Sequence, residues 1–183
     1  MGYFAVIDTE TNWVDRVMSI GTVIADCDTF QPVDMKYHVL TPEYEIGGMY
    51  ENELFSDPNR MPVICSRAEA LNAILCWLSG FGVTDIYAYN ASFDRNHLPE
   101  LSSLVWHDII RIAAYRQYNP KIPASAECCS TGRMKRNYGV EPMLKLLSGA
   151  QSYRETHNAL LDALDELEIM RLLGLKPRDY IKL

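Results

Sequence analysis

The chain lacks the features that mark an exported protein, a membrane protein or a disulfide-stabilised domain. Its first residues contain no basic segment followed by an apolar core and a cleavage site, and no apolar run approaches the length of a membrane span. The five cysteines are odd in number and include no C-x-x-C pair, which favours reduced thiols over disulfides or a zinc site. We therefore expect a cytoplasmic protein with no membrane partner.

Positive charge is also scarce. The 17 lysines and arginines face 24 acidic residues, and a net charge of -7 argues at first against a polyanionic partner. The distribution is uneven, however, because residues 109–150 contain seven basic and two acidic residues, a local balance of +5. A solvated helical surface would explain this balance, and so would a binding track for a polyanion. The second interpretation gives Arg133 and Arg136 phosphate contacts.

Length and composition predict one globular domain over residues 1–183. A chain that is 48% hydrophobic can bury a sizeable core at this length without disulfides. Apolar runs at 3–7, 20–25 and 36–40, with short connections between them, predict three strands of an antiparallel meander. Residues 41–64 contain prolines, adjacent glycines and many acids, and are predicted to form a loop or lid.

The pattern then changes to a helical period. Ser66-x-x-Glu69 is a capping box, and the apolar stripe after it predicts a helix that ends near Gly80. Further strands are expected at 85–89 and 105–107. A short helix is expected between these strands, and later helices are expected over 109–118, 131–138, 142–148 and 157–173, with Asp108 and Gly139 as boundary residues. These elements predict an α/β fold with a mixed sheet covered by helices.

Two acidic motifs directly follow apolar runs. Asp8 and Glu10, in Asp8-Thr9-Glu10, are two residues apart and would point to the same face of an extended strand. Asp94 ends the motif Asn90-Ala91-Ser92-Phe93-Asp94. Taken alone, the first motif is explained by a solvated strand end and the second by an acid near a helix N-terminus that Ser92 caps. Ligands of open α/β sheets bind beyond the carboxyl ends of strands, which is where both motifs fall.

A third motif joins His157 to Asp162. Five residues turn an ideal helix by about 500°, so the two side chains converge only if His157 lies at or before the first turn. Thr156 is then a candidate cap. An imidazole there can deprotonate a water near neutral pH, and nearby carboxylates can hold hard divalent cations. The alternative is a surface histidine beside a solvated acid.

Together, the three motifs resemble the DEDDh 3′–5′ exonucleases, which include bacterial proofreading subunits, oligoribonuclease and ribonuclease T. DTE, NASFD and HNALLD occur in the family's order, and IGTVIAD and the pair Tyr138-Gly139 add to the resemblance. It extends from about Tyr3 to Leu173. The resemblance implies a ribonuclease H-like fold, with a five-stranded mixed sheet and helices on both faces.

The resemblance also implies a set of catalytic residues. Asp8, Glu10, Asp94 and Asp162 correspond to the four acids that hold two divalent cations, Mg²⁺ or Mn²⁺, and His157 corresponds to the general base. The implied reaction is two-metal-ion hydrolysis that releases nucleoside 5′-monophosphates from the 3′ end of single-stranded DNA or RNA.

Substrate contacts are expected beside the motifs, from Thr9, Asn12, Trp13 and Asn90, in addition to the two arginines named above. Trp13 departs from the small residues common in the family after the first motif, and could stack on a base or cover the core. A second departure is Asp108-Ile109, where the family often has Asp-Thr.

Two alternatives stay open at this point. One is a catalytically inactive nucleic-acid-binding module on the same fold, which is disfavoured because all five catalytic positions carry the expected residue types. The other is an endonuclease, against which the histidine motif argues. The choice between DNA and RNA, the oligomeric state and a polymerase or homodimer partner are not determined by the sequence.

Overall fold

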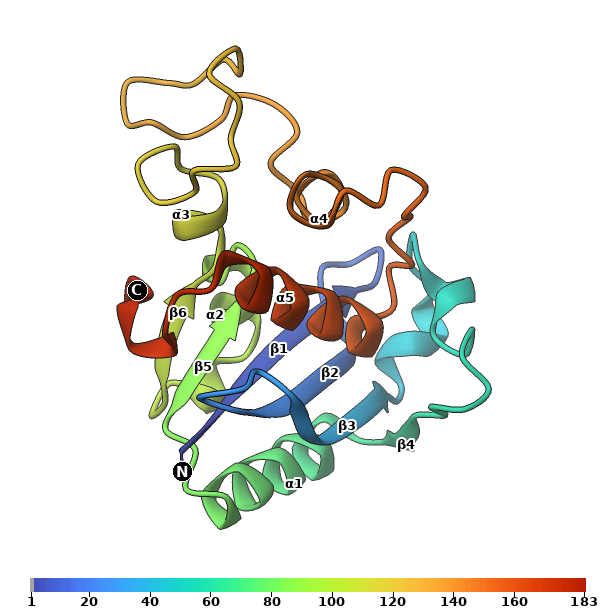
Figure 1. The fold of residues 1–183 in the computed structure, drawn as a ribbon. Coiled ribbons are helices and arrows are strands. Elements are labelled where there is room, and N and C mark those ends of the chain that lie inside the picture. The colour runs from blue at the N-terminus through green and yellow to red at the C-terminus, as the bar shows by residue number, and fades with distance from the viewer. Residues whose placement is uncertain (1) are drawn as a thin grey trace.

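The computed structural model describes residues 2–183 and contains a mixed six-stranded sheet with helices on both faces (Figure 1). The strand order is β4-β3-β2-β1-β5-β6. The strands are β1 (Tyr3–Thr11), β2 (Val17–Asp26), β3 (Pro32–Leu40), β4 (Val63–Cys65), β5 (Asp85–Ala88) and β6 (Val105–Asp108). The α-helices are α1 (Arg67–Gly80), α2 (Ser92–His97), α3 (Ile110–Ala113), α4 (Val140–Ser148) and α5 (Ala159–Leu173). The predicted α/β class is confirmed.

Short 3₁₀ helices complete the fold. They are η1 (Glu43–Ile46), η2 (Glu51–Glu53), η3 (Pro99–Leu101) and η4 (Pro177–Asp179). Within residues 2–183, no helix combines the length and the apolar composition that crossing a membrane requires.

The sheet has one strand more than the five that were expected. The extra strand, β4, lies in the segment predicted to be a loop or lid, and it pairs in parallel with the edge of β3. Val63 and Ile64 of β4 are both largely exposed, so the strand shows no alternation of apolar and polar residues. No pattern in the sequence therefore indicated it. The rest of the segment includes η1 and η2 and lies beside the β1–β2 turn.

Strand β1 holds the sheet together. It pairs with antiparallel β2 along its whole length and in parallel with β5 through Ala5 and Val6. β2 and β3 are also antiparallel, which confirms the predicted meander. β1 continues to Thr11, so Asp8 and Glu10 lie within the strand and not after it as expected. The pairing becomes irregular between Glu10 and Thr11, where the chain leaves the sheet.

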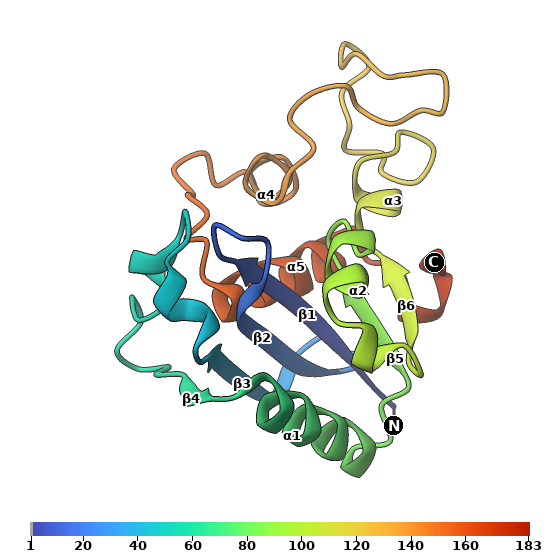
Figure 2. The ribbon, with the colours of Figure 1, turned by 180° about the vertical axis from the view of Figure 1, so that it is seen from behind.

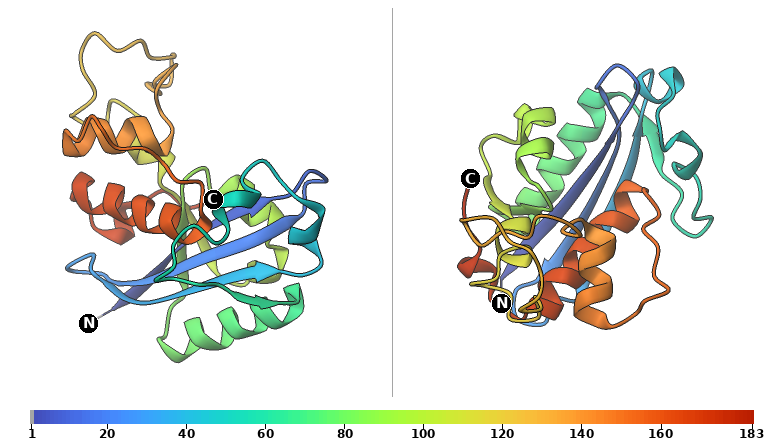
Figure 3. Two further views of the ribbon diagram at one scale, coloured as in Figure 1. Left: turned by 90° about the vertical axis from the view of Figure 1, so that its right-hand side faces the viewer. Right: turned by 90° about the horizontal axis from the view of Figure 1, so that it is seen from above.

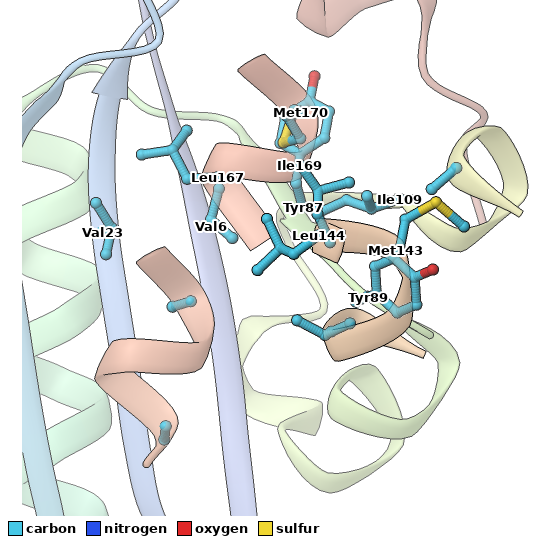
Figure 4. Packing of buried hydrophobic residues seen from close by; sticks show 14 of the residues in the cluster. Val6, Val23, Tyr87, Tyr89, Ile109, Met143, Leu144, Leu167, Ile169 and Met170 are labelled. Atoms are coloured by element: carbon cyan, nitrogen blue, oxygen red, sulfur yellow. The ribbon is translucent and has the colours of Figure 1, made fainter. Parts of the chain in front are cut away.

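Side chains alternate along β1 and contribute to two separate cores. Phe4 and Val6 belong to the core beneath α4 and α5, which Figure 4 shows from close by. Ala5 and Ile7 belong to the core beneath α1. The two groups of helices lie on opposite sides of the sheet in Figure 3, and Figure 2 shows α1 and α2 from their own side.

The start of α5 lies directly on β2 because position 21 has no side chain. A Cβ atom at Gly21 would lie 2.2 Å from the carbonyl carbon of Ala159 and 2.3 Å from the nitrogen of Leu160. Gly21 is also the residue of β2 that pairs with Asp8 of β1. The missing side chain therefore lets the first turn of α5 approach the strand that carries Asp8.

The chain between β6 and α5 is less helical than predicted. The helix expected over 109–118 is limited to α3, and Ile109 rather than Asp108 occupies its N-cap position. Asp108 instead accepts a hydrogen bond from the Ile110 nitrogen (3.2 Å). Gly139 is the N-cap of α4 and does not end a preceding helix.

Residues 115–138 form what we call the lobe, which projects from the body of the protein beyond α3 and α4 (Figure 1). No helix forms over 131–138; the backbone there makes isolated bridges, from Arg133 to Tyr115 and from Met134 to Cys128. The lobe leaves the sheet after β6 and α3, so its base lies at the carboxyl end of the parallel strands. Its two sides are joined where the Met134 nitrogen donates to the Ala114 carbonyl (2.9 Å).

The close contact at Gly21 gives a stability prediction. Gly21→Ala forces a methyl group into the backbone of α5, and overpacking of this kind costs about 1–3 kcal/mol. Gly80→Ala is the control, because a Cβ atom there meets nothing within 4 Å and alanine favours the helix. In thermal and urea unfolding, Gly21→Ala should therefore be less stable than the parent, and Gly80→Ala should be as stable as the parent or more stable. Equal stability of the two variants would contradict the contact.

Candidate functional site

β1 brings two of the expected acids to the face of the sheet that α5 covers. Phe4 and Val6 point to this face, and Asp8 and Glu10 continue the same alternation. The Asp8 Oδ2 atom is buried and has no hydrogen-bond partner among the described residues. The two acids therefore lie on one face, as residues two apart on a strand should.

The N-terminus of α5 is fixed by Asn158. Its side-chain Oδ1 accepts hydrogen bonds from the nitrogens of Leu160 (3.2 Å) and Leu161 (3.4 Å). The expected cap, Thr156, lies outside the helix, because Asn158 is the residue placed to reach the free N–H groups of the first turn.

The same helix start brings a histidine and a third acid together with Glu10. His157 precedes the helix with a φ of 58°, and Asp162 lies in its first turn. Ligand atoms of Glu10, His157 and Asp162 all lie within 4.8 Å of one another. The condition set by the five-residue spacing is met, since His157 lies just before the first turn and not within the helix.

The fourth acid comes from α2, beyond the end of β5. Asp94 is only 2% exposed, and its Oδ1 accepts a hydrogen bond from the Thr9 hydroxyl (2.8 Å). Thr9 points to the face of β1 opposite Asp8, so this bond ties the two motifs together across the strand. Ser92 was expected to cap α2, but Ala91 occupies the N-cap position and makes no side-chain cap.

Burial and mutual repulsion raise the pKa values of these carboxyl groups. Burial raises the pKa of Asp94 to about 7. The pKa of Glu10 is raised to about 8 by burial and by the charges of Glu155 and Asp94. Burial, Glu155 and Glu10 raise the pKa of Asp162 to about 9. The pKa of Asp8 is raised well above its ordinary value by burial and by four surrounding carboxylates.

Two further acids join this group that the sequence motifs did not indicate. Glu166 is 2% exposed, its Oε2 has no hydrogen-bond partner among the described residues, and of the neighbouring charges it acts most strongly on Asp8. It follows Asp162 by one helical turn, so both acids lie on one face of α5. Glu155 is half-buried, and burial raises its pKa. Glu166 falls on the apolar stripe of α5. An acid on a buried stripe is unusual, and this position could have identified Glu166 as a candidate site residue from the sequence.

This set of residues fits hard divalent cations. The buried oxygens Asp8 Oδ2, Asp162 Oδ1 and Glu166 Oε2 have no hydrogen-bond partner within residues 2–183. Carboxylate oxygens are the ligands that Mg²⁺ and Mn²⁺ prefer, and unpaired buried carboxylates need either counter-charge or protons. The donor set is therefore suited to cations of this kind.

A cavity of about 310 Å³ lies next to these acids. Glu10 lines it together with Trp13, Met49, Tyr50 and Phe93. Trp13 is 65% exposed, which excludes one of its two possible roles, that of covering the core. The wall of the cavity therefore combines one acid, Glu10, with the aromatic side chains of Trp13, Tyr50 and Phe93.

Asn12 and Asn90 stand at turns of the backbone. Asn12 is 5% exposed; its Nδ2 donates to the Glu43 carbonyl (2.8 Å), and its Oδ1 accepts from the nitrogens of Val14 and Arg16. Its Oδ1 is thus committed to the β1–β2 turn, and its Nδ2 joins that turn to η1. Asn90 follows β5 with a φ of 63°, a conformation that asparagine tolerates better than most residues, and it is exposed.

Arg133 and Arg136 lie in the lobe and are exposed. Neither lines the cavity beside Glu10. The Arg133 guanidinium packs over the ring of Tyr138, 5.1 Å from its centroid, near the point where the lobe joins α4. Within the described residues, these two cations are therefore not part of the cavity wall.

Comparison of the sequence with protein-family models and with curated proteins gives no match. Comparison of the structure with solved structures gives many. The nuclease domain of 3′hExo, a DEDDh family member bound to rAMP, has a TM-score of 0.69 and 15% identity; the match covers 99% of this chain and 96% of that domain.

Two other exonucleases share the architecture. Exonuclease X in complex with 5′-overhanging duplex DNA has a TM-score of 0.53 and 18% identity, over 96% of this chain and 95% of that one. Exonuclease I from Methylocaldum szegediense has a TM-score of 0.60 and 15% identity, over 98% of this chain and 42% of the larger enzyme. The chain therefore has the fold of the DEDDh 3′-exonuclease domains, as its three motifs implied.

Proposed function

We propose that the protein is a divalent-metal-dependent 3′–5′ exonuclease that acts on single-stranded nucleic acid and releases nucleoside 5′-monophosphates. The observation that carries the proposal is the convergence of Glu10, His157 and Asp162 within 4.8 Å, with Asp8 and Asp94 interacting electrostatically with the same group. These five residues come from three separate parts of the sequence. The fold of known exonuclease domains supports the proposal.

In the proposed hydrolysis, the acids, His157 and Thr9 have separate roles. Two divalent cations, Mg²⁺ or Mn²⁺, held by Asp8, Glu10, Asp94 and Asp162 would supply charge neutralisation at the phosphodiester and acidify a water. His157 takes the proton from the attacking water, which its position at the edge of the acids allows. The hydrogen bond from Thr9 holds the Asp94 carboxylate in one orientation, so that less reorganisation is needed when cations bind.

The cavity beside Glu10 suits the terminal nucleotide. Glu10 in its wall would place a phosphodiester near the cations, while Trp13 and Phe93 offer exposed aromatic surface on which a base can stack. Stacking is tolerant of base identity, so we expect little sequence preference at the 3′ end. Solved structures with this fold include one bound to rAMP and one with an oligonucleotide of deoxythymidine, so the fold is compatible with both sugars.

The alternative, a binding module without catalysis, is less well supported, because no catalytic position carries a disabling residue type. Incubating 5′-labelled DNA and RNA oligonucleotides of matched sequence with Mn²⁺ distinguishes the two. Shortening from the 3′ end supports the enzyme, and retention of intact strands supports the binding module. Comparing the two substrates also identifies the preferred sugar.

The buried acids predict an unusual pH dependence of stability. The folded pKa values of about 7 for Asp94, 8 for Glu10 and 9 for Asp162 lie above the unfolded values near 4. The folded state therefore binds more protons between about pH 4 and 9, and the free energy of unfolding falls as pH rises through that interval. In chelator, Tm should drop from pH 5 to pH 8, and saturating Mn²⁺ should remove most of the drop.

Two variants make the pH experiment specific. Asp162→Asn should flatten the fall of Tm, because it removes one of the repelling charges. Glu168→Gln changes an acid of the same helix that pairs with Arg171 at the surface, and should leave the slope as it is. A Tm that stays level with pH in chelator would show that the acids do not repel one another.

Substitution of the catalytic groups tests the reaction itself. Asp8→Ala should abolish turnover, since the cations lose a central ligand. His157→Ala should lower the rate by about 10²–10⁴-fold, the usual contribution of a positioned base, and should leave Mn²⁺ and oligonucleotide binding nearly unchanged. The rate of the parent should rise with pH and then level off, and His157→Ala should lose that rise. A fully active Asp8→Ala protein would refute the assignment.

The lobe gives a prediction about strand binding. Arg133→Glu with Arg136→Glu should weaken the binding of long oligonucleotides of any sequence and flatten its salt dependence, because contacts to phosphates do not read bases. Cleavage of a dinucleotide should stay near the parent rate. Lys176→Glu with Arg178→Glu makes the same change in net charge at exposed positions outside the lobe. If both double variants behave alike, the lobe is a solvated surface and not a strand track.

A further inference from the structure

Tyr50 stacks on His157. The two ring centroids are 3.9 Å apart and the ring planes are inclined by 16°, which is close to parallel. Both side chains are half-buried. No other histidine among the described residues stacks on a tyrosine of the segment between β3 and β4.

The histidine needs such support. His157 precedes the helix and has a φ of 58°, a backbone conformation that residues other than glycine adopt only when their surroundings hold them there. The adjacent Asn158 caps the helix with its Oδ1 atom. The imidazole itself is therefore placed by what packs against its ring and not by helical backbone.

Tyr50 is well placed to give that support because its own segment is tied down on both sides. We call residues 42–54 the strap. On one side of Tyr50, the backbone nitrogen of Trp13 donates to the Gly47 carbonyl (3.0 Å). On the other side, the Asn158 Nδ2 donates to the Glu53 carbonyl (2.7 Å). The strap thus connects the β1–β2 turn to the cap of α5.

A second anchor fixes the far end of the strap. The Tyr37 hydroxyl donates to the Leu54 carbonyl (3.0 Å), and the Asn158 Nδ2 also contacts the Tyr37 hydroxyl (3.1 Å). The residue beside the histidine and the segment that carries Tyr50 therefore share one hydrogen-bond network. Movement of the strap moves the tyrosine ring and the helix cap together.

Tyr50 also belongs to the cavity proposed for the terminal nucleotide. It lines that cavity with Trp13, Met49 and Phe93, while its ring covers His157. Burial, together with the charges of Glu10 and Glu155, raises the pKa of its phenol. One aromatic ring thus forms part of the cavity wall and also contacts the imidazole.

We propose that Tyr50 is a positioning residue that holds the His157 imidazole against the acidic group and links its placement to the nucleotide cavity. The proposal rests on the exonuclease function proposed above, in which His157 is the base. Tyr50 touches neither the proton in transfer nor the cations; it acts through the imidazole.

A first experiment examines the stack without catalysis. The ring current of Tyr50 should shift the His157 ring protons upfield in the metal-free protein, and a spectrum of His157→Gln identifies their signals among the four histidines. Tyr50→Phe should keep the upfield position, and Tyr50→Leu should move it downfield. Tyr44→Leu is the control, because Tyr44 lies on the same strap but packs edge-on against Phe55. A His157 signal unmoved in Tyr50→Leu overturns the proposal.

A second experiment asks whether Tyr50 acts through His157. Tyr50→Leu should lower kcat by about 10–100-fold, since small displacements of a catalytic group have effects of that size. Tyr50→Phe retains the ring and should keep the kcat of the parent. In a His157→Ala background, Tyr50→Leu should cost almost nothing more, because residues that act as a unit are not additive. A full additional loss in that background would mean that Tyr50 serves binding or folding alone, and overturns the proposal.

The two experiments separate the possible failures. If the parent shows no nuclease activity, the proposed function fails, whereas the proton signals still report whether Tyr50 holds the imidazole. If the parent is active and the two losses add, the function stands and the role of Tyr50 fails. Melting curves for each variant confirm that comparisons are made on folded protein.

Discussion

Carboxylates of like charge raise one another's free energy when they share a poorly solvated site, and the centre of this fold is organised around such a group. β1 remains paired with β2 at Asp8 and Glu10, so the two acids are held two residues apart on one face of the strand. α5 cannot retreat either, because its cap Asn158 is bonded to the strap. The acids are therefore held together by a scaffold that gains its stability elsewhere, in two large apolar cores. Bound cations or protons must neutralise the repulsion that remains between the carboxylates. The stability of the protein is therefore connected to the cations of its proposed chemistry.

Much of this arrangement follows from short-range patterns. The meander, the capping box before α1 and the stripe of α5 depend on local periodicity, and each was predicted close to its observed position. The three acidic motifs also indicated the fold, through the family resemblance that their order and internal spacing carry. Each of these correct predictions rests on a pattern that lies within a few neighbouring residues.

The errors arise where distant contacts decide the structure. β4 has exposed apolar side chains and exists because β3 offers a free edge. The helix expected over 131–138 is replaced by turns that bridge to Tyr115 and Cys128. Glu166 lies on an apolar stripe, yet its relation to Asp8 depends on how α5 crosses β1. The stack of Tyr50 on His157 joins residues more than a hundred positions apart, and no local pattern encodes it.

The lobe has a consequence for how such a protein can change. Residues 123–133 are largely exposed, and the chain on either side is closed by the bond between Met134 and Ala114. A surface loop whose ends are already joined can be lengthened, shortened or exchanged at small cost in closure entropy and without disturbing the sheet. The lobe, and with it the proposed strand track, can therefore evolve as a separable part. The group of acids, which β1 and α5 hold from several sides, tolerates no comparable freedom, so we expect change to concentrate in the periphery while the acids stay fixed.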